Sequence, residues 1–270
     1  MTRRTYIASR SNERLKAVRR LARTRPRDVF VAEGARAVRA ALEAGAEIRE
    51  LFAAPELFLG EGDIDLVAAA ELRGVRVLEL GREAFRSISG SVRADGLVAV
   101  IARPSTALAR LALPEQPLVV VAETIERPGN LGAIVRTAAG AGVDALIVAD
   151  ARTDVFHPEV VRGSVGAIFH LPLAVASSER VPAWLREREV RIVVATPEAR
   201  RRYWDAEYTG GTAIVVGNER YGLTDPWRHT ADEAVAVPLP GPADSLNVAV
   251  AAGIVLFEAA RQRLCAAPAL

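Results

Sequence analysis

The sequence predicts an α/β protein with a small N-terminal domain, a linker and a larger domain built around a parallel sheet. Short apolar strands alternate with helical segments along most of the chain. A proline-containing stretch interrupts this alternation. The strands beyond it are apolar at every position, which is typical of parallel sheets covered by helices on both faces. With 270 residues, half of them hydrophobic, the chain is long enough for two separate cores.

The N-terminal part reads as a small α/β unit. A helix is expected at 11–24, with Ser11 or Asn12 as its N-cap and Pro26 just beyond its end. The elements that follow are strands at 29–32, 48–54, 75–80 and 97–102, and helices at 35–44 and 64–73. We therefore expect one domain over residues 1–103. Residues 104–117 are predicted to be a linker, since they contain three prolines and no clear strand.

The rest of the chain, residues 118–270, is predicted to form the parallel-sheet domain. Strands are expected at 118–122, 145–149, 191–195, 213–217 and 234–239. Helices are expected at 131–141, 158–167, 179–188 and, as the longest, about 245–264. Ligand sites of such domains lie at the carboxyl ends of the strands.

Charge is distributed unevenly along the chain. Residues 1–40 contain 12 Lys and Arg against 3 Asp and Glu, whereas the other residues hold 23 basic and 30 acidic side chains. A basic N-terminal arm indicates a polyanionic partner, although a solvated helix in an arginine-rich chain would look the same. Arg19, Arg20 and Arg23 are the arm residues that we expect to contact a nucleic acid, because a guanidinium group can grip a phosphate with two hydrogen bonds.

The sequence lacks the features of several classes of protein. No apolar run is long enough for a membrane span, and the start has no apolar region of a secretory signal. The single cysteine, Cys265, excludes an internal disulfide framework and any cysteine-rich metal site. The expectation is a cytoplasmic protein without a metal.

The first segment that could carry chemistry follows strand 118–122 and reads ERPGNLGAIVR, residues 126–136. Asn130 is expected to cap the helix that follows, and the nearby glycines permit close backbone approach. Arg136 lies six residues beyond Asn130 in that helix. An ordinary glycine-containing turn followed by a surface arginine is the alternative interpretation.

Two further segments also place polar residues where a strand ends. Residues 216–223, VGNERYGL, bring an amide and a carboxylate to the rim of the sheet, although a polar turn before a helix would look alike. Residues 237–249, VPLPGPADSLNVA, form a Pro/Gly-rich loop before the last helix. We expect Asp244 or Ser245 to cap this helix, and capping leaves Asn247 without an explanation. The free N–H groups of a helix start could hold a carboxylate or carbonyl group.

Other catalytic patterns are missing from the sequence. No GxGxxG motif follows a strand, and neither a P-loop motif nor a GxSxG motif occurs. The three histidines are scattered without metal-ligand spacing, so each is read as a surface or packing residue.

Taken in order, the three segments resemble the motifs of the SpoU/TrmH family of SPOUT methyltransferases. The similarity lies in PGNLGAIVRTAAGAG, IVVGNERYGL and VPLPGPADSLNVAVAAGIVLFE, with VRGSVGAIFHLP between them, and no motif residue is missing. The N-terminal FVAEGARAVRAAL is similar to the start of the substrate-binding domain that many members carry, which itself resembles small ribosomal RNA-binding proteins.

The resemblance implies a fold, a cofactor and an assembly. The C-terminal segment would thread through a loop to form a deep trefoil knot, and two copies would form a homodimer whose active sites are completed across the interface. S-adenosylmethionine would be the cofactor. Its binding residues would be Ala195, Thr196, Gly217, Asn218, Val237, Leu239, Ser245 and Leu246.

The implied reaction is methylation of a ribose 2′-hydroxyl in RNA, with 23S ribosomal RNA as the expected substrate. The implied catalytic residues are Asn130, Arg136, Glu219, Ser245 and Asn247. The family role of Arg136 as a proton acceptor is physically demanding, since arginine rarely deprotonates, so we expect it to orient the hydroxyl and a phosphate. A transfer-RNA methyltransferase, an antibiotic-resistance methyltransferase acting on ribosomal RNA, and a catalytically silent RNA-binding protein remain alternatives.

Overall fold

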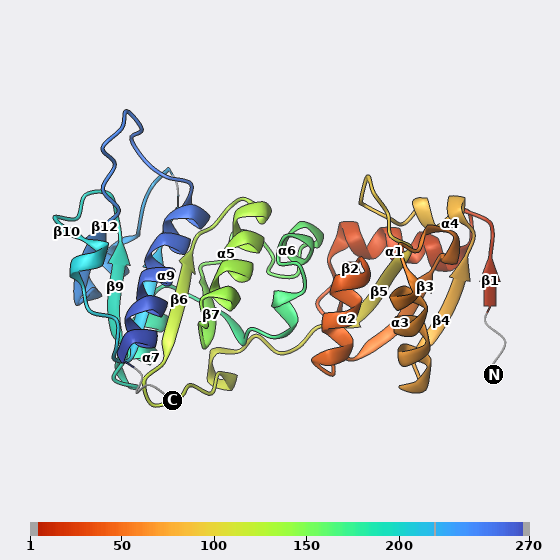
Figure 1. Cartoon of the computed structure of the whole chain (residues 1–270), viewed down its shortest axis with the longest axis horizontal. Coiled ribbons are helices and arrows are strands. Elements are labelled where there is room, and N and C mark those ends of the chain that lie inside the picture. Colours follow the sequence, from red (N-terminus) through yellow and green to blue (C-terminus); the bar gives the residue numbers. More distant parts are fainter. Residues whose placement is uncertain (1–4, 219, 267–270) are drawn as a thin grey trace. The chain divides into compact units, whose positions relative to one another are not determined.

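The structure is a computed structural model that describes residues 5–218 and 220–266. The chain divides into two compact units (Figure 1). Unit 1 comprises Met1–Pro104 and Phe156–His170, and unit 2 comprises Ser105–Val155 and Leu171–Leu270. Each unit has its own sheet and its own buried core. Among the described residues, no helix is both long and apolar enough to cross a membrane.

Unit 1 contains a mixed five-stranded sheet in the order β1-β4-β3-β5-β2. Its strands are β1 (Thr5–Ile7), β2 (Val29–Glu33), β3 (Ile48–Ala53), β4 (Arg76–Leu80) and β5 (Leu97–Ala102). Strand β5 pairs antiparallel with both β2 and β3, while β4 pairs parallel with β1 and β3. The helices are α1 (Glu13–Thr24), α2 (Ala35–Glu43), α3 (Glu61–Leu72) and α4 (Arg82–Arg86).

The ends of α1 follow from local chemistry. Asn12, and not Ser11, is the N-cap, and its side-chain oxygen accepts a hydrogen bond of 2.9 Å from the Arg14 N–H. The helix ends at Thr24, and its C-cap Arg25 has a left-handed φ of 47° and precedes Pro26. Leu15 and Val18 are buried, so one face of the helix packs on the core of unit 1.

A segment from the second half of the sequence also belongs to unit 1. It contains α6 (Pro158–Gly163), and the rings of Phe156 and Phe169 lie 4.6 and 6.0 Å from the ring of Phe30. The helix is shorter than the predicted 158–167, because Val165 and Gly166 both have positive φ values and end the helical conformation.

Unit 2 contains a seven-stranded sheet in the order β10-β12-β9-β11-β6-β7-β8. Every pairing in it is parallel, which confirms the prediction of a parallel sheet. The strands are β6 (Leu118–Glu123), β7 (Ala145–Ala149), β8 (Leu173–Ala176), β9 (Arg191–Ala195), β10 (Arg201–Arg202), β11 (Thr212–Val216) and β12 (Glu233–Ala236). All residues of β6, β7 and β11 are buried, as their apolar sequences require.

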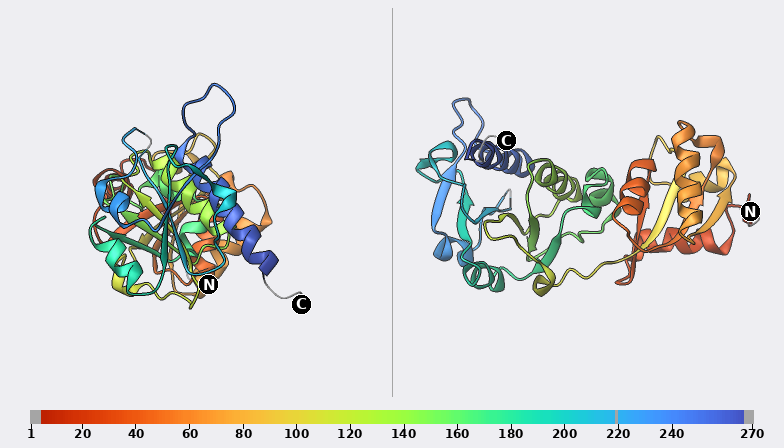
Figure 2. Two further views of the ribbon diagram at one scale, coloured as in Figure 1. Left: turned by 90° about the vertical axis from the view of Figure 1, so that its left-hand side faces the viewer. Right: turned by 60° about the horizontal axis from the view of Figure 1, so that its bottom comes forward.

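The helices of unit 2 are α5 (Pro128–Gly140), α7 (Arg180–Arg186), α8 (Asp225–Thr230) and α9 (Val248–Ala266). The last helix, α9, lies alongside α5 in both Figure 1 and Figure 2. Two predicted caps are wrong. Asn130 lies within the first turn of α5, whose N-cap is Arg127, and α9 begins after Asn247, not after Asp244 or Ser245. The predicted strand 234–239 ends at Ala236, so Val237 and Leu239 lie beyond it.

Candidate active site at the carboxyl ends of the parallel strands

The sheet order of unit 2 gathers the predicted site segments at one edge. Ala195 ends β9 and pairs in register with Val216 of β11 on one side and Val235 of β12 on the other. Gly217 and Val237 therefore follow strands that lie on either side of β9. Strand β6, which precedes Asn130, is the other neighbour of β11. The segments after β12, β9, β11 and β6 thus meet at adjacent strand ends, where parallel α/β domains bind ligands.

A cleft of about 150 Å³ opens at this edge. It is lined by Ile125, Glu126, Arg127, Asn130, Asn218, Arg220 and Val248. These residues come from the loop after β6, the loop after β11 and the start of α9, which are the three segments that the sequence singles out. Within the described residues, no group of three or more His, Cys, Asp or Glu side chains is placed to hold a metal ion.

A hydrogen bond joins the first and the third segment. The Nδ2 group of Asn247 donates to Oδ1 of Asn130 at 3.0 Å, although the two residues are 117 positions apart. The Oδ1 atom of Asn247 accepts from the backbone N–H groups of Ala249 at 3.0 Å and Val250 at 3.4 Å. Asn247 therefore caps α9 and at the same time ties its start to the first turn of α5.

Asn218 joins the second segment to the end of β6. Its buried side chain donates from Nδ2 to the backbone oxygen of Thr124 at 3.1 Å. Its Oδ1 atom accepts from the N–H groups of Arg220 and Tyr221 at 2.8 and 3.3 Å. Both polar atoms are engaged by backbone groups, so the side chain holds the loop after β11 against the loop after β6.

Glu123, which sequence reasoning missed, holds the other end of the same loop. Its carboxylate is fully buried at the end of β6. It accepts hydrogen bonds from Ser178 Oγ at 2.8 Å, from the Thr224 N–H at 3.0 Å and from the Thr224 hydroxyl. A buried carboxylate needs several donors to offset its loss of hydration, and this one has three. An acidic residue directly after five apolar strand residues was the available signal.

Gly217 occupies a position of the site that has no room for a side chain. A Cβ atom there would lie 2.8 Å from the Gly222 carbonyl oxygen and 2.8 Å from a methyl group of Leu223, so any side chain would force the loop to move. Asn218 and Gly222 form an isolated antiparallel bridge, and Gly222 has a φ of 67°. The glycines thus permit the tight turn that places Asn218 and Arg220 in the cleft.

The other predicted residues differ in their surroundings. Arg136 is exposed in the third turn of α5, and Ser245 is exposed in the loop before α9. Six predicted cofactor residues are neither fully buried nor exposed, namely Ala195, Thr196, Gly217, Val237, Leu239 and Leu246. The backbone N–H of Thr196 donates to the Val235 oxygen at 2.9 Å. Glu219 lies outside the described residues.

In the basic arm, two of the three predicted arginines have side chains that are exposed and could contact a ligand. Arg20 and Arg23 are exposed on α1. Arg19 is half-buried and donates hydrogen bonds to Ser87 Oγ at 2.9 Å and to the Arg10 carbonyl oxygen at 3.1 Å. Its side chain therefore contributes to the packing of unit 1.

The structure thus has a parallel α/β domain with a cleft at its strand ends and a second α/β unit. The chain belongs to the SpoU rRNA methylase family, whose model matches residues 117–257. A second model, the MRM3-like substrate binding domain, matches residues 12–99.

Individual relatives agree with this assignment. The chain is 34% identical to the 23S rRNA (uridine(2479)-2′-O)-methyltransferase of Streptomyces viridochromogenes, with 87% of this chain and 83% of the relative aligned. It is 32% identical to the 23S rRNA (guanosine-2′-O-)-methyltransferase RlmB of Escherichia coli K12, over 85% and 97% of the two chains. Its structure matches the AdoMet-bound rRNA methyltransferase from Sinorhizobium meliloti with a TM-score of 0.84 and 31% identity, over 95% and 97% of the chains.

Proposed function

We propose that this protein methylates a ribose 2′-hydroxyl of 23S ribosomal RNA, with S-adenosylmethionine as the methyl donor. The observation that carries the proposal is the meeting of three segments distant in sequence at one cleft, tied by the Asn130–Asn247 and Asn218–Thr124 hydrogen bonds. Membership of the SpoU family and the 23S rRNA 2′-O-methyltransferase names of the relatives support the reaction and the substrate. In this reaction the 2′-oxygen forms a bond to the methyl group and gives up its proton to solvent, while the bond from the methyl group to sulfur breaks and S-adenosylhomocysteine is left.

The residues at the strand ends fit the cofactor. S-adenosylmethionine supplies a methyl group activated on a positively charged sulfur atom. Ala195, Val237, Leu239 and Leu246 offer partly buried apolar surface that suits the faces of an adenine ring. We assign backbone contacts to Gly217 and Thr196, which directly follow the paired ends of β11 and β9, and a hydroxyl contact to Ser245. Asn218 acts mainly by holding the loop, because its side chain already bonds to three backbone groups.

We assign positioning roles to the polar residues of the cleft. Asn130 and Asn247 fix each other, so that the start of α9 and the first turn of α5 present one preformed surface to the ribose. Arg136, exposed one to two turns further along α5, orients the hydroxyl and an adjacent phosphate. Glu219, outside the described residues, is proposed to position Arg136 and the ribose.

Substitution of Arg136 tests its role. We expect both Arg136→Ala and Arg136→Lys to lower the rate of methyl transfer, because only the planar guanidinium group holds two oxygens at once. The measurement is the single-turnover rate across pH. An Arg136→Lys variant with near-normal rates and a new, lower pKa in the profile would instead favour proton abstraction by this residue.

The activity itself is tested with tritiated S-adenosylmethionine and purified RNA. We expect label in 23S ribosomal RNA and not in transfer RNA, with the modified nucleotide mapped by primer extension at low nucleotide concentration. Preferential labelling of transfer RNA would contradict the substrate assignment. Absence of cofactor binding by calorimetry at millimolar concentration would contradict the enzyme assignment and leave a silent RNA-binding protein.

We propose that residues 1–103 form the substrate-binding domain and that 104–117 link it to the methyltransferase domain at 118–270, of which the segment Phe156–His170 belongs to unit 1. The exposed guanidinium groups of Arg20 and Arg23 support an RNA contact by α1. Neutralising these two residues is expected to weaken RNA binding and to flatten its salt dependence, with cofactor affinity unchanged. Unchanged RNA affinity would overturn the role of the arm. Arg19 is left intact in this test because it also bonds within unit 1.

A deep trefoil knot in the C-terminal part is a further element of the proposal. The chain leaves β12, beyond β9 in the sheet, and then forms α9, which packs against α5 and β11. To reach β11 from β12, this connection has to pass β9, which supports a path over the loop that Asn218 and Glu123 hold. Stretching single molecules by their ends tests the knot, because a knotted chain stays shorter than the extended length of about 3.3–3.6 Å per residue.

We also propose that the active unit is a homodimer that works in the cytoplasm with its ribosomal substrate. Val250, Phe257 and Leu264 recur every seven residues along α9, and their side chains are 51, 53 and 77% exposed. Residues spaced in this way lie on one face of a helix, and a second copy of this chain is the occupant we assign to that face.

A further inference from the structure

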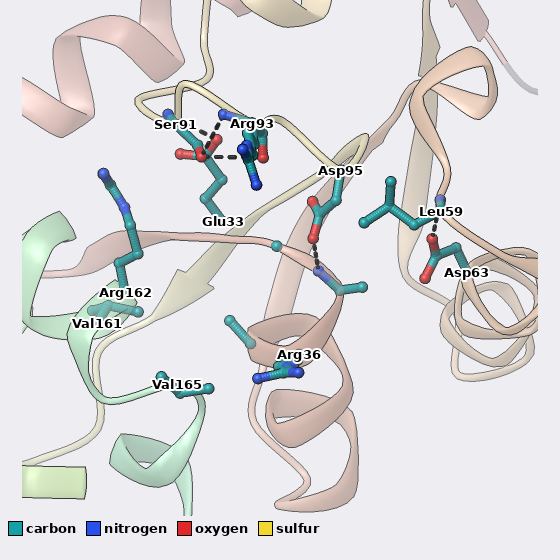
Figure 3. Close-up of a pocket in the computed structure, with 13 residues that line it drawn as sticks. Glu33, Arg36, Leu59, Asp63, Ser91, Arg93, Asp95, Val161, Arg162 and Val165 are labelled. Carbon is teal, nitrogen blue, oxygen red and sulfur yellow. Dashed lines mark hydrogen bonds between the residues drawn. The ribbon is translucent and has the colours of Figure 1, made fainter.

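A second hollow, of about 300 Å³, lies within unit 1 and is larger than the cleft of the candidate active site. It is bordered by the turn between β2 and α2, by the residues around Leu59 and Asp63, by the loop that precedes β5 and by α6. Figure 3 shows Val161, Arg162 and Val165 on one side of it and Leu59 and Asp63 on the other. Its volume lies at the lower end of the range of small-ligand sites.

The carboxylates around this hollow are engaged in holding the backbone. Glu33 accepts from the N–H groups of Gly90 and Ser91 at 2.9 and 3.2 Å. Asp63 accepts from the Leu59 N–H at 2.9 Å, and Asp95 accepts from the Ala35 N–H at 2.7 Å (Figure 3). The other oxygen of Asp95 is covered by protein. These acidic groups therefore shape the loops and are poorly available to a ligand.

The arginines of the hollow, in contrast, are available. Arg36, Arg93 and Arg162 are exposed. Within the part of the chain that the structure describes, the side chains of Arg36 and Arg93 form no hydrogen bond or ion pair. Arg162 donates to the Gly90 carbonyl oxygen at 3.3 Å. The charge that the hollow offers to a ligand is thus positive.

Apolar groups stand beside these charges. Leu59 lines the hollow with its side chain 84% exposed, and Val92, between two lining residues, is fully exposed. Val161 and Val165 form the opposite apolar wall. A ligand that matches this surface has a flat apolar part and a negatively charged part. A nucleotide with its base unstacked has both.

The walls of the hollow are fixed by unusual backbone conformations. Val165 has a φ of 52°, which a β-branched residue rarely adopts, so surrounding contacts must hold it there. At the neighbouring Gly166, with a φ of 93°, an added Cβ would lie 2.8 Å from the Ala40 Cβ, so α2 and the turn that follows α6 are in close contact. A hollow whose walls are preset in this way can bind without first being ordered.

We propose that this hollow binds one unstacked nucleotide of the RNA substrate. The base of this nucleotide lies against Leu59, Val161 and Val165, and its phosphate pairs with Arg36 and Arg93. The inference rests on the proposed function, because an RNA substrate is what makes a nucleotide the favoured occupant over an acidic peptide.

Matched pairs of variants test the proposal in the full-length protein. Arg93→Ala and Arg36→Ala are compared with Arg76→Ala, which removes the same charge from an exposed position of β4 outside the hollow. Leu59→Ala is compared with Leu72→Ala, an equally exposed leucine at the end of α3. Affinity is measured by fluorescence anisotropy with a short labelled single-stranded RNA at several salt concentrations.

Each hollow variant is expected to bind this RNA roughly tenfold more weakly, with a smaller salt slope for the two arginine variants, while the controls stay near the wild type. Arg93→Lys, which keeps the charge, is expected to recover only part of the affinity. Equal losses in the hollow and control variants would overturn the proposal. Displacement of the RNA from the wild type by polyglutamate, but not by a nucleoside monophosphate, would overturn it in favour of a peptide.

Cofactor binding and methyl transfer are measured in the same samples. If the wild type transfers no methyl group but the hollow variants lose RNA affinity, the proposed function is refuted and the hollow remains a nucleotide site. If the wild type methylates 23S ribosomal RNA normally and the hollow variants bind RNA as well as their controls do, only the proposed nucleotide site in the hollow is refuted.

Discussion

Asn247 has two hydrogen-bonding roles that substitution can separate. Its oxygen caps α9, and its amide N–H donates to Asn130 across the cleft. We expect Asn247→Ala to lower the free energy of unfolding by about 1 kcal/mol, the usual effect of losing an N-cap. Asn247→Asp keeps a capping oxygen and should keep the stability, yet it cannot donate to Asn130 and should lower methyl transfer as much as Asn247→Ala does.

The two effects are measured by urea unfolding and by methyl transfer to 23S ribosomal RNA. A normal rate in Asn247→Asp would show that the bond to Asn130 does not matter for the reaction. Asn130→Ala is the matched control, since it removes the acceptor of the same hydrogen bond from a residue that is not the cap of α5.

Asp95 makes the stability of unit 1 depend on pH. Burial raises the pKa of its carboxyl group, and the nearby Asp63 adds to the rise, while backbone hydrogen bonds oppose it. The folded protein therefore holds this proton more tightly than the unfolded chain does. The contribution of Asp95 to stability is largest below the ordinary aspartate pKa of about 4 and is lost as the pH rises through the raised value.

Asp95→Asn is expected to remove this part of the pH dependence, because an amide oxygen can still accept from the Ala35 N–H and carries no charge. Urea unfolding between about pH 3 and pH 7 measures the difference between variant and wild type. Asp65→Asn, at an exposed position of α3, is the control. A pH dependence in Asp95→Asn that parallels the wild type would contradict the assignment.

At the scale of elements, Glu123 and Asn218 hold the loop between β11 and α8 at both of its ends. We expect Glu123→Gln to loosen this loop, because an amide cannot accept from all three of its present donors and turns an N–H group toward them. A loss of about 1–3 kcal/mol in unfolding free energy is expected for a buried donor left unsatisfied. Trypsin cleavage after Arg220 should become faster in the folded protein.

Ser178→Ala provides the comparison, since it removes one donor to the same carboxylate and leaves both bonds to Thr224. Cleavage after Arg220 should then stay close to the wild-type rate. If Glu123→Gln is cleaved no faster than Ser178→Ala, the carboxylate does not hold the loop.

Sequence patterns predicted the elements that are long and apolar, and they failed where side chains from distant segments decide. The strands at the centre of unit 2 follow from their runs of four or five apolar residues. Short elements such as β1, β8, β10, α4 and α8 were missed, because two to six residues carry little periodicity. Strand β10, with only two residues, depends entirely on its pairing with β12.

The site illustrates the same limit. The motif segments were recognised by their resemblance to a family, whereas the partners of their side chains were not predictable. Asn130 and Asp244 are good capping residues by type, yet Arg127 and Asn247 occupy the N-cap positions. The burial of Glu123 and its bond to Thr224 depend on a neighbour 101 residues away, which no local pattern encodes.

At the scale of the whole molecule, the apolar face of α9 should govern assembly. We expect Phe257→Glu to convert a dimer into a monomer, because a charge cannot be buried in an apolar interface without a partner. Sedimentation equilibrium measures the change. Leu72→Glu, an equally drastic change at an exposed leucine of unit 1, is the control and should leave the mass unchanged. A wild-type protein that is monomeric at all concentrations would refute the assembly.

The hydrogen bond between Asn130 and Asn247 also sets when activity can begin. The first turn of α5 leaves the ribosome 117 residues before its partner does, so a growing chain lacks the completed cleft for most of its synthesis. Contacts so distant in sequence form late and slowly. Such a protein would therefore become active in a single late step, after α9 has left the ribosome and has docked on α5. A truncated translation product that stops before Asn247 would stay inactive.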